Sequence, residues 1–208
     1  MPEFDDLAKR TQEDSKSELL REALDDIPPP KNHVGRVTAF TIAIAREMGL
    51  TKEEINVIAT GAYLHDIGKM AIPEAILLKP GALTPEETDT IREHCLLGYK
   101  IVQKSPFPAG VDEIVYSHHE RYDGTGYPRG LKGEEIPLGA RIVAVANTLD
   151  SITTKLPYRA AQSLDAAKAE IQRWSGRQFD PEIVRVFLQM PDNIWSEIIQ
   201  SMHSQAPA

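Results

Sequence analysis

Apolar residues recur at helical spacing along most of the chain and divide it into a series of predicted helices. In residues 32–48 they surround the predicted helix on more than one side. Thr51 and Glu54 have the spacing of a capping box, which marks the start of the next helix, and Thr84 and Glu87 repeat this pattern. The sequence therefore predicts helices over residues 32–48, 51–65, 84–94, 111–118, 139–153, 164–174, 181–189 and 192–202, and no segment has the pattern of a sheet.

The start of the chain forms a unit of its own. Sparse but helically spaced apolar residues predict a charged lead-in helix over 3–27, and three prolines in succession separate it from the main domain, because proline cannot continue a helix. We expect a lead-in helix and proline-rich linker in 1–30, a main domain in 31–190, and a C-terminal helix and tail in 191–208. Two interpretations of residues 3–27 stay open, a weak coiled coil that forms a homodimer and a plain solvated helix.

The composition is that of a globular protein, with 41% hydrophobic and 26% charged residues. The net charge of -8 repels a nucleic-acid backbone, so a long nucleic acid is not an expected partner. The single cysteine, Cys95, cannot form an internal disulfide or a zinc site built from cysteines, and the polar start lacks the apolar core of a signal peptide. We therefore expect a cytoplasmic protein without a membrane segment.

Five of the six histidines lie in or beside these predicted helices: His33, His65, His94, His118 and His119. A single histidine is more often ordinary packing, but several helices that each direct one or two ligands inward can hold a metal cluster in a bundle. Asp66, next to His65, offers a carboxylate that can bridge two ions. Two divalent ions about 3.5 to 4 Å apart can activate a water for attack on phosphorus, so this pattern indicates phosphate-ester hydrolysis.

Two further features belong with the histidines. Lys69 follows Asp66 by three positions and His65 by four, so its ammonium lies on the same helix face and can reach a metal-bound phosphate. Directly after the adjacent pair of histidines, four glycines within residues 124–133 exclude a regular element. This segment is either an ordinary surface loop or, because of its position, a binding loop beside the metals.

At these residues the chain resembles a known family. The segments His65-Asp66-Ile67-Gly68-Lys69 and His118-His119-Glu120-Arg121-Tyr122-Asp123-Gly124-Thr125-Gly126-Tyr127-Pro128 look like the two motifs of the HD-GYP domain, a bacterial branch of the HD phosphohydrolases. The resemblance covers residues 32–188 and includes Pro157-Tyr158-Arg159. It implies an all-α fold, an HD-superfamily helical bundle with a metal centre in its core. It also implies a cyclic di-GMP phosphodiesterase that forms linear pGpG or GMP and uses two divalent ions, iron or manganese.

The resemblance also assigns roles to single residues. It implies that the first metal is held by His33, His65 and bridging Asp66, and the second by Asp66, His94, His118 and His119. It gives catalytic roles to Asp66 and Lys69, and substrate contacts to Lys69, Gly126, Tyr127, Pro128 and Arg159.

Three positions depart from the family pattern. Asn147 stands where the family usually has an Asp that completes the first metal site, so an amide replaces a carboxylate as the expected ligand of the first metal. Pro29 stands where members with three metals have a Glu, so a third metal is not expected. Leu156 stands where an Arg usually helps to hold the substrate. The departures at Asn147 and Leu156 predict lowered activity.

Three functions stay open at this point. The first is a working cyclic di-GMP phosphodiesterase with reduced activity. The second is a degenerate HD-GYP module that binds metal or nucleotide and acts as a signalling or interaction domain. The third is a phosphohydrolase for another nucleotide, such as a mixed cyclic dinucleotide. The resemblance implies a cyclic dinucleotide as the substrate, and an upstream sensory domain or a protein such as a diguanylate cyclase as further partners.

Overall fold

The structure, a computed structural model, describes residues 33–154 and 160–200. Its α-helices are α2 (His33–Glu47), α3 (Lys52–Leu64), α4 (Glu74–Leu77), α5 (Pro85–Arg92), α6 (His94–Gln103), α7 (Val111–Ser117), α8 (Leu138–Thr153), α9 (Leu164–Arg173), α10 (Pro181–Gln189) and α11 (Asp192–Gln200). Two short 3-10 helices are η1 (Ile67–Ala71) and η2 (Gly133–Glu135). Within these ranges the only β-type pairing is an isolated bridge between Ser175 and Phe179, so the predicted all-α fold is confirmed.

Both predicted capping boxes are present. The Thr51 hydroxyl accepts a hydrogen bond from the Glu54 backbone N–H, while the Glu54 carboxylate accepts one from the Thr51 N–H. Thr84 and Glu87 are paired in the same way at the start of α5. These reciprocal bonds satisfy backbone donors that a helix would otherwise leave free. Because the signal is local, both helix starts were predicted correctly from the sequence.

The predicted helix over 84–94 is wrong at its end. Helix α5 stops at Arg92, and a separate helix, α6, begins at His94 and continues to Gln103. The cause is tertiary packing, because η1 passes so close to α6 that a Cβ atom on Gly68 would lie 2.0 Å from the His94 carbonyl oxygen. The break at this position brings the first turn of α6 against the residues that come directly after α3.

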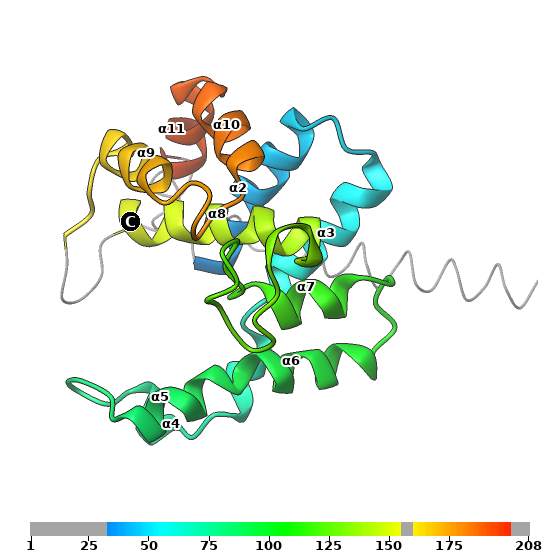
Figure 1. Cartoon of the computed structure of the whole chain (residues 1–208), viewed down its shortest axis with the longest axis vertical. Helices are drawn as coiled ribbons and strands as arrows, with labels where there is room; N and C mark the ends of the chain where they lie inside the picture. The colour runs from blue at the N-terminus through cyan, green and yellow to red at the C-terminus, as the bar shows by residue number, and fades with distance from the viewer. Residues whose placement is uncertain (1–32, 155–159, 201–208) are drawn as a thin grey trace, which may run out of the picture.

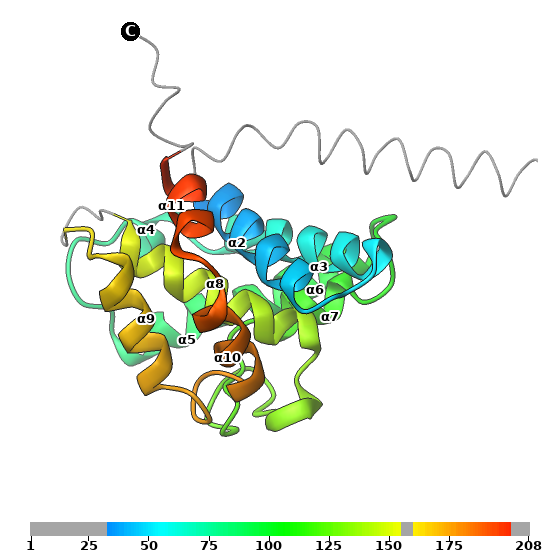
Figure 2. The ribbon, with the colours of Figure 1, turned by 90° about the horizontal axis from the view of Figure 1, so that it is seen from above.

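Helices α2 and α8 form the centre of the bundle and pack on each other, with α3 and α11 against α2 and with α9 against α8 (Figures 1 and 2). The main core includes Phe40, Ile142 and Trp195, none of which is exposed to solvent. The Trp195 ring lies 5.9 Å from the Phe40 ring, so α11 shares the core of the main domain. A smaller cluster around Val115 joins α7 to α6.

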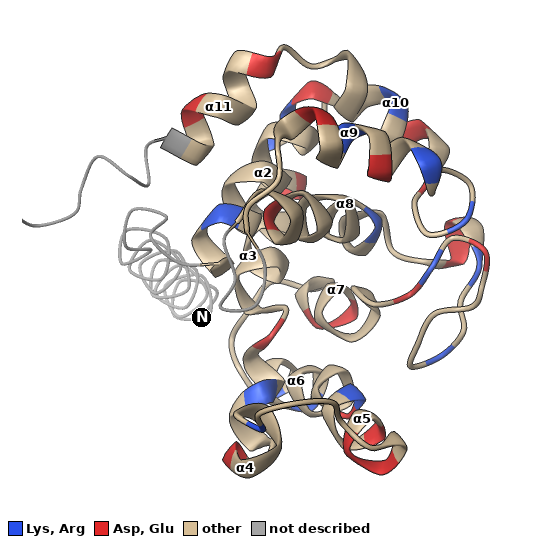
Figure 3. Ribbon diagram, turned by 90° about the vertical axis from the view of Figure 1, so that its left-hand side faces the viewer, with Lys and Arg blue, Asp and Glu red and all other residues tan. Residues whose placement is uncertain are grey.

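Helices α4 and α5 form an arm that stands away from the bundle beyond α6 (Figures 1 and 3). None of the described helices is long and apolar enough to cross a membrane. The predicted lead-in helix over 3–27, the proline-rich linker, Leu156, Arg159 and the C-terminal tail lie outside the residues that the structure describes.

Candidate metal centre

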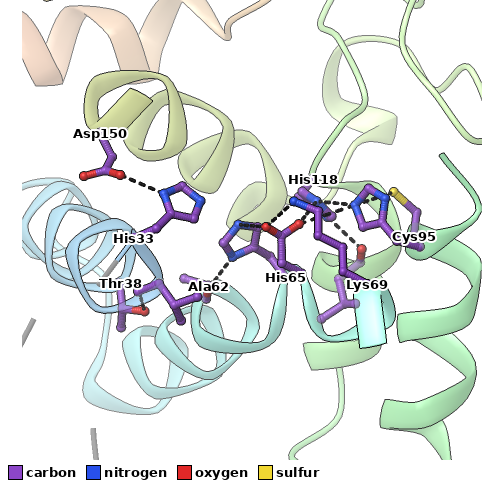
Figure 4. Close-up of polar contacts among 12 residues, drawn as sticks. His33, Thr38, Ala62, His65, Lys69, Cys95, His118 and Asp150 are labelled. Atoms are coloured by element: carbon purple, nitrogen blue, oxygen red, sulfur yellow. Dashed lines mark hydrogen bonds and ion pairs between the residues drawn. The ribbon is translucent and has the colours of Figure 1, made fainter. Parts of the chain in front are cut away.

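Asp66 lies between two groups of histidines at the meeting point of three helix ends. Its Oδ2 is 3.5 Å from Nε2 of His65, which caps the end of α3. Its Oδ1 is 3.5 Å from Nε2 of His94, the first residue of α6, and 3.9 Å from Nε2 of His118, which caps α7 (Figure 4). The two oxygens of one carboxylate therefore face two different sets of imidazole nitrogens.

Hydrogen bonds to the backbone determine which nitrogen of each ring carries the proton. Nδ1 of His65, His94 and His118 each donates to the carbonyl oxygen three residues earlier, at 2.7, 2.7 and 2.8 Å. A carbonyl oxygen only accepts hydrogen bonds, so the proton resides on Nδ1 and Nε2 has a free lone pair. Backbone geometry at the three helix ends thus prepares three Nε2 atoms as ligands.

These histidines stay neutral at neutral pH. Burial lowers the pKa of His65, His94 and His118 below the usual value of 6.5, and for His119 burial together with the nearby His94 lowers the pKa to about 3. Consequently Nε2 of His94 and Nε2 of His118, 3.3 Å apart, present two lone pairs to each other. Nε2 of His65 is buried with no hydrogen-bond partner in the described part of the chain.

Such an arrangement of acceptors fits cations. Unprotonated nitrogens and a carboxylate cannot hydrogen-bond to one another, but together they are the donor set of divalent iron, zinc or manganese. Two groups of side chains have candidate ligand atoms that all lie within 4.8 Å of one another. The groups are His33, His65 and Asp66, and His94, Cys95, His118 and His119. The structure therefore brings together six of the seven predicted ligands, all except Asn147: His33, His65, Asp66, His94, His118 and His119.

Asp150 supports the first group and was not predicted as a site residue. Its carboxylate accepts a hydrogen bond from Nδ1 of His33 at 2.7 Å and forms an ion pair with Arg36. Although burial raises the pKa of Asp150, hydrogen bonds from His33 and Arg36 lower it more, so the carboxyl is ionised. Asp150 is separated from His33 by 117 positions, and its only sequence signal is that it comes three positions after Asn147 on one helix.

Lys69 lies beside the predicted bridge. Its Nζ is 2.6 Å from Oδ2 of Asp66, and its side chain is 41% exposed. Burial raises the pKa of Asp66, but His65 and Lys69 lower it more, so this carboxyl is also ionised. The Lys69 ammonium is therefore held at the site by Asp66 and is still accessible from solvent.

A cavity of about 260 Å³ adjoins the second group. His118, His119 and Asn147 line one part of it, and Gly126 and Tyr127 of the predicted irregular loop line another. The Tyr127 ring stacks on the His119 ring with centroids 4.9 Å apart. Asn147 lies on α8, as expected, and its role as a metal ligand stays a prediction.

Glu120 fixes the shape of the loop and was also missed. Its buried carboxylate accepts hydrogen bonds from the backbone N–H groups of Arg129, at 2.7 Å, and Leu131, at 3.1 Å. At Gly126 a Cβ atom would lie 2.3 Å from the Arg121 backbone nitrogen. The loop can therefore fold against the histidine pair only with glycine at this position.

Comparison with known proteins agrees with this geometry. The chain matches the family model described as HD domain over residues 18–183. It is 44% identical over 165 residues to a cyclic di-GMP phosphodiesterase of Thermotoga maritima, covering 78% of this chain and 45% of that protein. It is 46% identical over 148 residues to the cyclic di-GMP phosphodiesterase response regulator RpfG of Xanthomonas campestris, covering 70% and 39%.

Other relatives act on a different cyclic dinucleotide. A 3'3'-cGAMP-specific phosphodiesterase of Vibrio cholerae is 35% identical over 169 residues, covering 80% of this chain and 32% of that protein. The solved structure of a cyclic GMP-AMP-specific phosphodiesterase from the same organism has a TM-score of 0.63 at 22% identity, covering 86% and 50%, which shows the shared fold. The chain spans less than half the length of these curated relatives.

Proposed function

Because this chain belongs to the HD domain family and carries the HD-GYP motifs, we propose that it is a metal-dependent phosphodiesterase that hydrolyses cyclic di-GMP to linear pGpG. One observation carries the proposal: an ionised carboxylate, Asp66, faces unprotonated Nε2 atoms of buried histidines on both sides. Curated relatives that are cyclic di-GMP phosphodiesterases, at 38% to 46% identity, support the choice of substrate.

The predicted ligands divide between two ions. The first would be held by His33, His65 and Asp66, and the second by Asp66, His94, His118 and His119. When bound, divalent iron or manganese ions supply activation of a water molecule and neutralisation of phosphate charge. The chain's own contribution is to hold the imidazoles in the ligating tautomer and to keep them neutral through burial.

Lys69 orients the substrate phosphate. Its ammonium is held beside Asp66 yet is partly exposed, so it can donate hydrogen bonds to a non-bridging oxygen of the scissile phosphodiester. Arg159, outside the described residues, is proposed as a second cation for the phosphates.

The loop of Gly126, Tyr127 and Pro128 holds the nucleotide. Gly126 and Tyr127 line the cavity beside His118 and His119, which brings a guanine in this cavity close to the metal centre. The Tyr127 ring packs on His119, and the Arg92 guanidinium lies over the ring at 5.2 Å. The tyrosine therefore contacts the base through its hydroxyl, or through the ring once Arg92 shifts from it.

Asn147 and Leu156 lower the activity in this proposal. A neutral amide at position 147 leaves Asp66 as the only carboxylate among the proposed ligands, so the first ion binds weakly. Two alternatives are a degenerate binding module and a hydrolase for a mixed cyclic dinucleotide. Relatives that are 3'3'-cGAMP-specific phosphodiesterases support the second alternative.

Metal analysis and product analysis on one preparation test the proposal. Protein purified without chelators is assayed for metal content and for turnover of cyclic di-GMP and 3'3'-cGAMP with iron(II) or manganese(II). We expect bound metal and slow formation of pGpG, with Asp66→Ala as the control that binds no ion. Bound metal without turnover of either nucleotide supports the binding module, and faster turnover of 3'3'-cGAMP supports the mixed substrate. The sensory domain, the diguanylate cyclase partner and the homodimer through 3–27 stay predictions.

A further inference from the structure

The only cysteine of the chain lies inside the second group of candidate ligands. Cys95 comes directly after His94 in the first turn of α6 and is completely buried. Its Sγ lies 3.6 Å from Nε2 of His94 (Figure 4). The candidate ligand atoms of Cys95 and of His94, His118 and His119 all lie within 4.8 Å of one another.

The sulfur of Cys95, a buried core residue, lies among candidate ligand atoms. Buried cysteines commonly behave as small apolar side chains. Cys95, however, belongs to neither of the two hydrophobic clusters in the described part of the chain. Its sulfur lies instead beside the Nε2 atom of His94, whose lone pair also faces Nε2 of His118 at 3.3 Å.

We infer that Cys95 is a sulfur ligand of the second metal ion, in addition to the histidines. The inference rests on the proposed function, because it requires a metal centre at these residues. Metal–sulfur bonds of about 2.3 Å and metal–nitrogen bonds of about 2.0 Å separate ligands on opposite sides of one ion by about 4.3 Å. The observed spread of ligand atoms, within 4.8 Å, is close to that dimension. Formation of the sulfur–metal bond releases the thiol proton to solvent.

A sulfur ligand changes which ion the second site prefers. Thiolate is a soft donor, whereas manganese(II) prefers carboxylate, carbonyl and water oxygens. One sulfur beside three imidazoles therefore favours iron(II), cobalt(II) or zinc(II) over manganese(II) at this site. The thiolate also contributes a negative charge to a centre in which Asp66 is the only carboxylate among the proposed ligands.

Cobalt(II) spectroscopy tests the inference without relying on activity. The parent protein loaded with cobalt is expected to show a thiolate-to-cobalt charge-transfer band in the near ultraviolet, together with visible bands from cobalt on imidazole. Cys95→Ala should lose the near-ultraviolet band and keep bound cobalt. His33→Gln is the matched control and should keep the band, because His33 belongs to the first group.

Metal competition gives a second readout on a more conservative variant. Cys95→Ser should lower the affinity for cadmium(II) relative to manganese(II) by roughly tenfold or more. A parent protein that holds cobalt without the near-ultraviolet band overturns the sulfur ligand and leaves the metal centre standing. A parent protein that binds no cobalt, iron or manganese overturns the metal centre and the sulfur ligand together.

Discussion

Asp150 accepts a hydrogen bond at 2.7 Å from Nδ1 of His33 and so ties the last turn of α8 to the first residue of α2. A carboxylate only accepts, so Nδ1 of His33 carries a proton, and Nε2, on the side of the ring that points toward His65, is the nitrogen that can bind a metal ion (Figure 4). The rings of His33 and His65 lie 5.5 Å apart. Asp150 therefore orients a predicted ligand of the first ion without itself belonging to the ligand group.

Replacing Asp150 by Asn should weaken the first ion selectively. The amide is neutral and can no longer balance Arg36 or hold the His33 tautomer firmly, so we expect roughly a 10- to 100-fold loss of affinity at the first site. Metal content after stepwise dialysis measures this loss. Thr154→Val is the control, because Thr154 also bonds to Asp150, at 3.1 Å, but from the side of Oδ1. Equal loss of both ions would show that Asp150 supports the whole fold rather than one site.

Lys69→Ala should reduce hydrolysis while leaving the melting temperature of the metal-loaded protein unchanged. The Lys69 side chain is partly exposed, and within the described part of the chain its ion pair is with Asp66, so its loss removes little packing. Removal of one charged donor to the phosphate should cost on the order of 100-fold in turnover. Lys79→Ala removes a comparable ion pair, with Glu87 on the arm, and should keep the parent rate. Parent turnover in Lys69→Ala would exclude the phosphate role.

The fold was predictable wherever the signals are local. The capping boxes at Thr51 and Thr84 satisfy backbone donors within one turn, and the helix over 181–189 was predicted with the observed bounds. The break before His94 was not predictable, because it depends on the close approach of Gly68 from another part of the chain. A glycine in the sequence can indicate that another part of the backbone lies close to it, but it does not indicate which part.

The same division applies to the site. The histidines that the structure brings together could be selected from the sequence because histidines are few and two of them form an adjacent pair, at His118 and His119. Asp150 and Glu120 were missed because acidic residues are common and their partners are distant in sequence or are backbone groups of a loop. No residue type or motif marks a charged residue that acts by orienting another group, so such a residue is identified only from the folded structure.

The metal-free protein should lose stability as the pH falls below neutrality. Burial lowers the pKa of His65, His94, His118 and His119, so the folded state binds fewer protons than the unfolded chain below pH 6.5. This stability is fully present above pH 6.5 and is lost as the pH falls toward the folded-state pKa values, of which the His119 value is about 3. His119, with a pKa of about 3 in the folded state, contributes a slope of about 1.4 kcal/mol per pH unit between that value and 6.5, and the other three histidines act in the same direction.

Denaturant titrations of the chelated protein between about pH 7.5 and about pH 5 measure this slope. Asp66 and Asp150, whose pKa values lie below the ordinary 3.8, stay ionised over that range and do not contribute. His119→Gln should reduce the slope of the unfolding free energy against pH by about 1.4 kcal/mol per pH unit, the value for one proton. A free energy of unfolding that is constant with pH would contradict neutral, buried histidines.

Tyr127→Ala should weaken nucleotide binding, and Tyr127→Phe separates the ring from the hydroxyl. Stacking on one base is worth about 1 to 3 kcal/mol, so loss of the ring should raise the dissociation constant for cyclic di-GMP by about 5- to 150-fold. The ring also stacks on His119 and lies under the Arg92 guanidinium, at 5.2 Å. Calorimetric titration of both variants, with metal content measured in parallel, makes the distinction. Parent affinity in Tyr127→Ala would remove the loop from the binding site.

Asn147→Asp should raise both metal retention and turnover at limiting metal. Asn147 lies on α8 and lines the cavity beside His118 and His119, three positions before the Asp150 carboxylate that holds His33. An amide oxygen can ligate, but it does not neutralise a dication, so we expect the first ion of the parent to be lost before the second on dialysis.

The added carboxylate of Asn147→Asp supplies a second negative charge beside Asp66, which should reverse that order or bring the two losses together. Thr148→Asp is the matched control, because it introduces the same charge one position along the same cavity wall. If Thr148→Asp raises metal retention as much as Asn147→Asp does, general charge rather than a ligand at position 147 limits the site. Tight binding of two ions and full turnover by the parent would show instead that the amide does not impair the centre, and that the first site is complete with His33, His65 and Asp66.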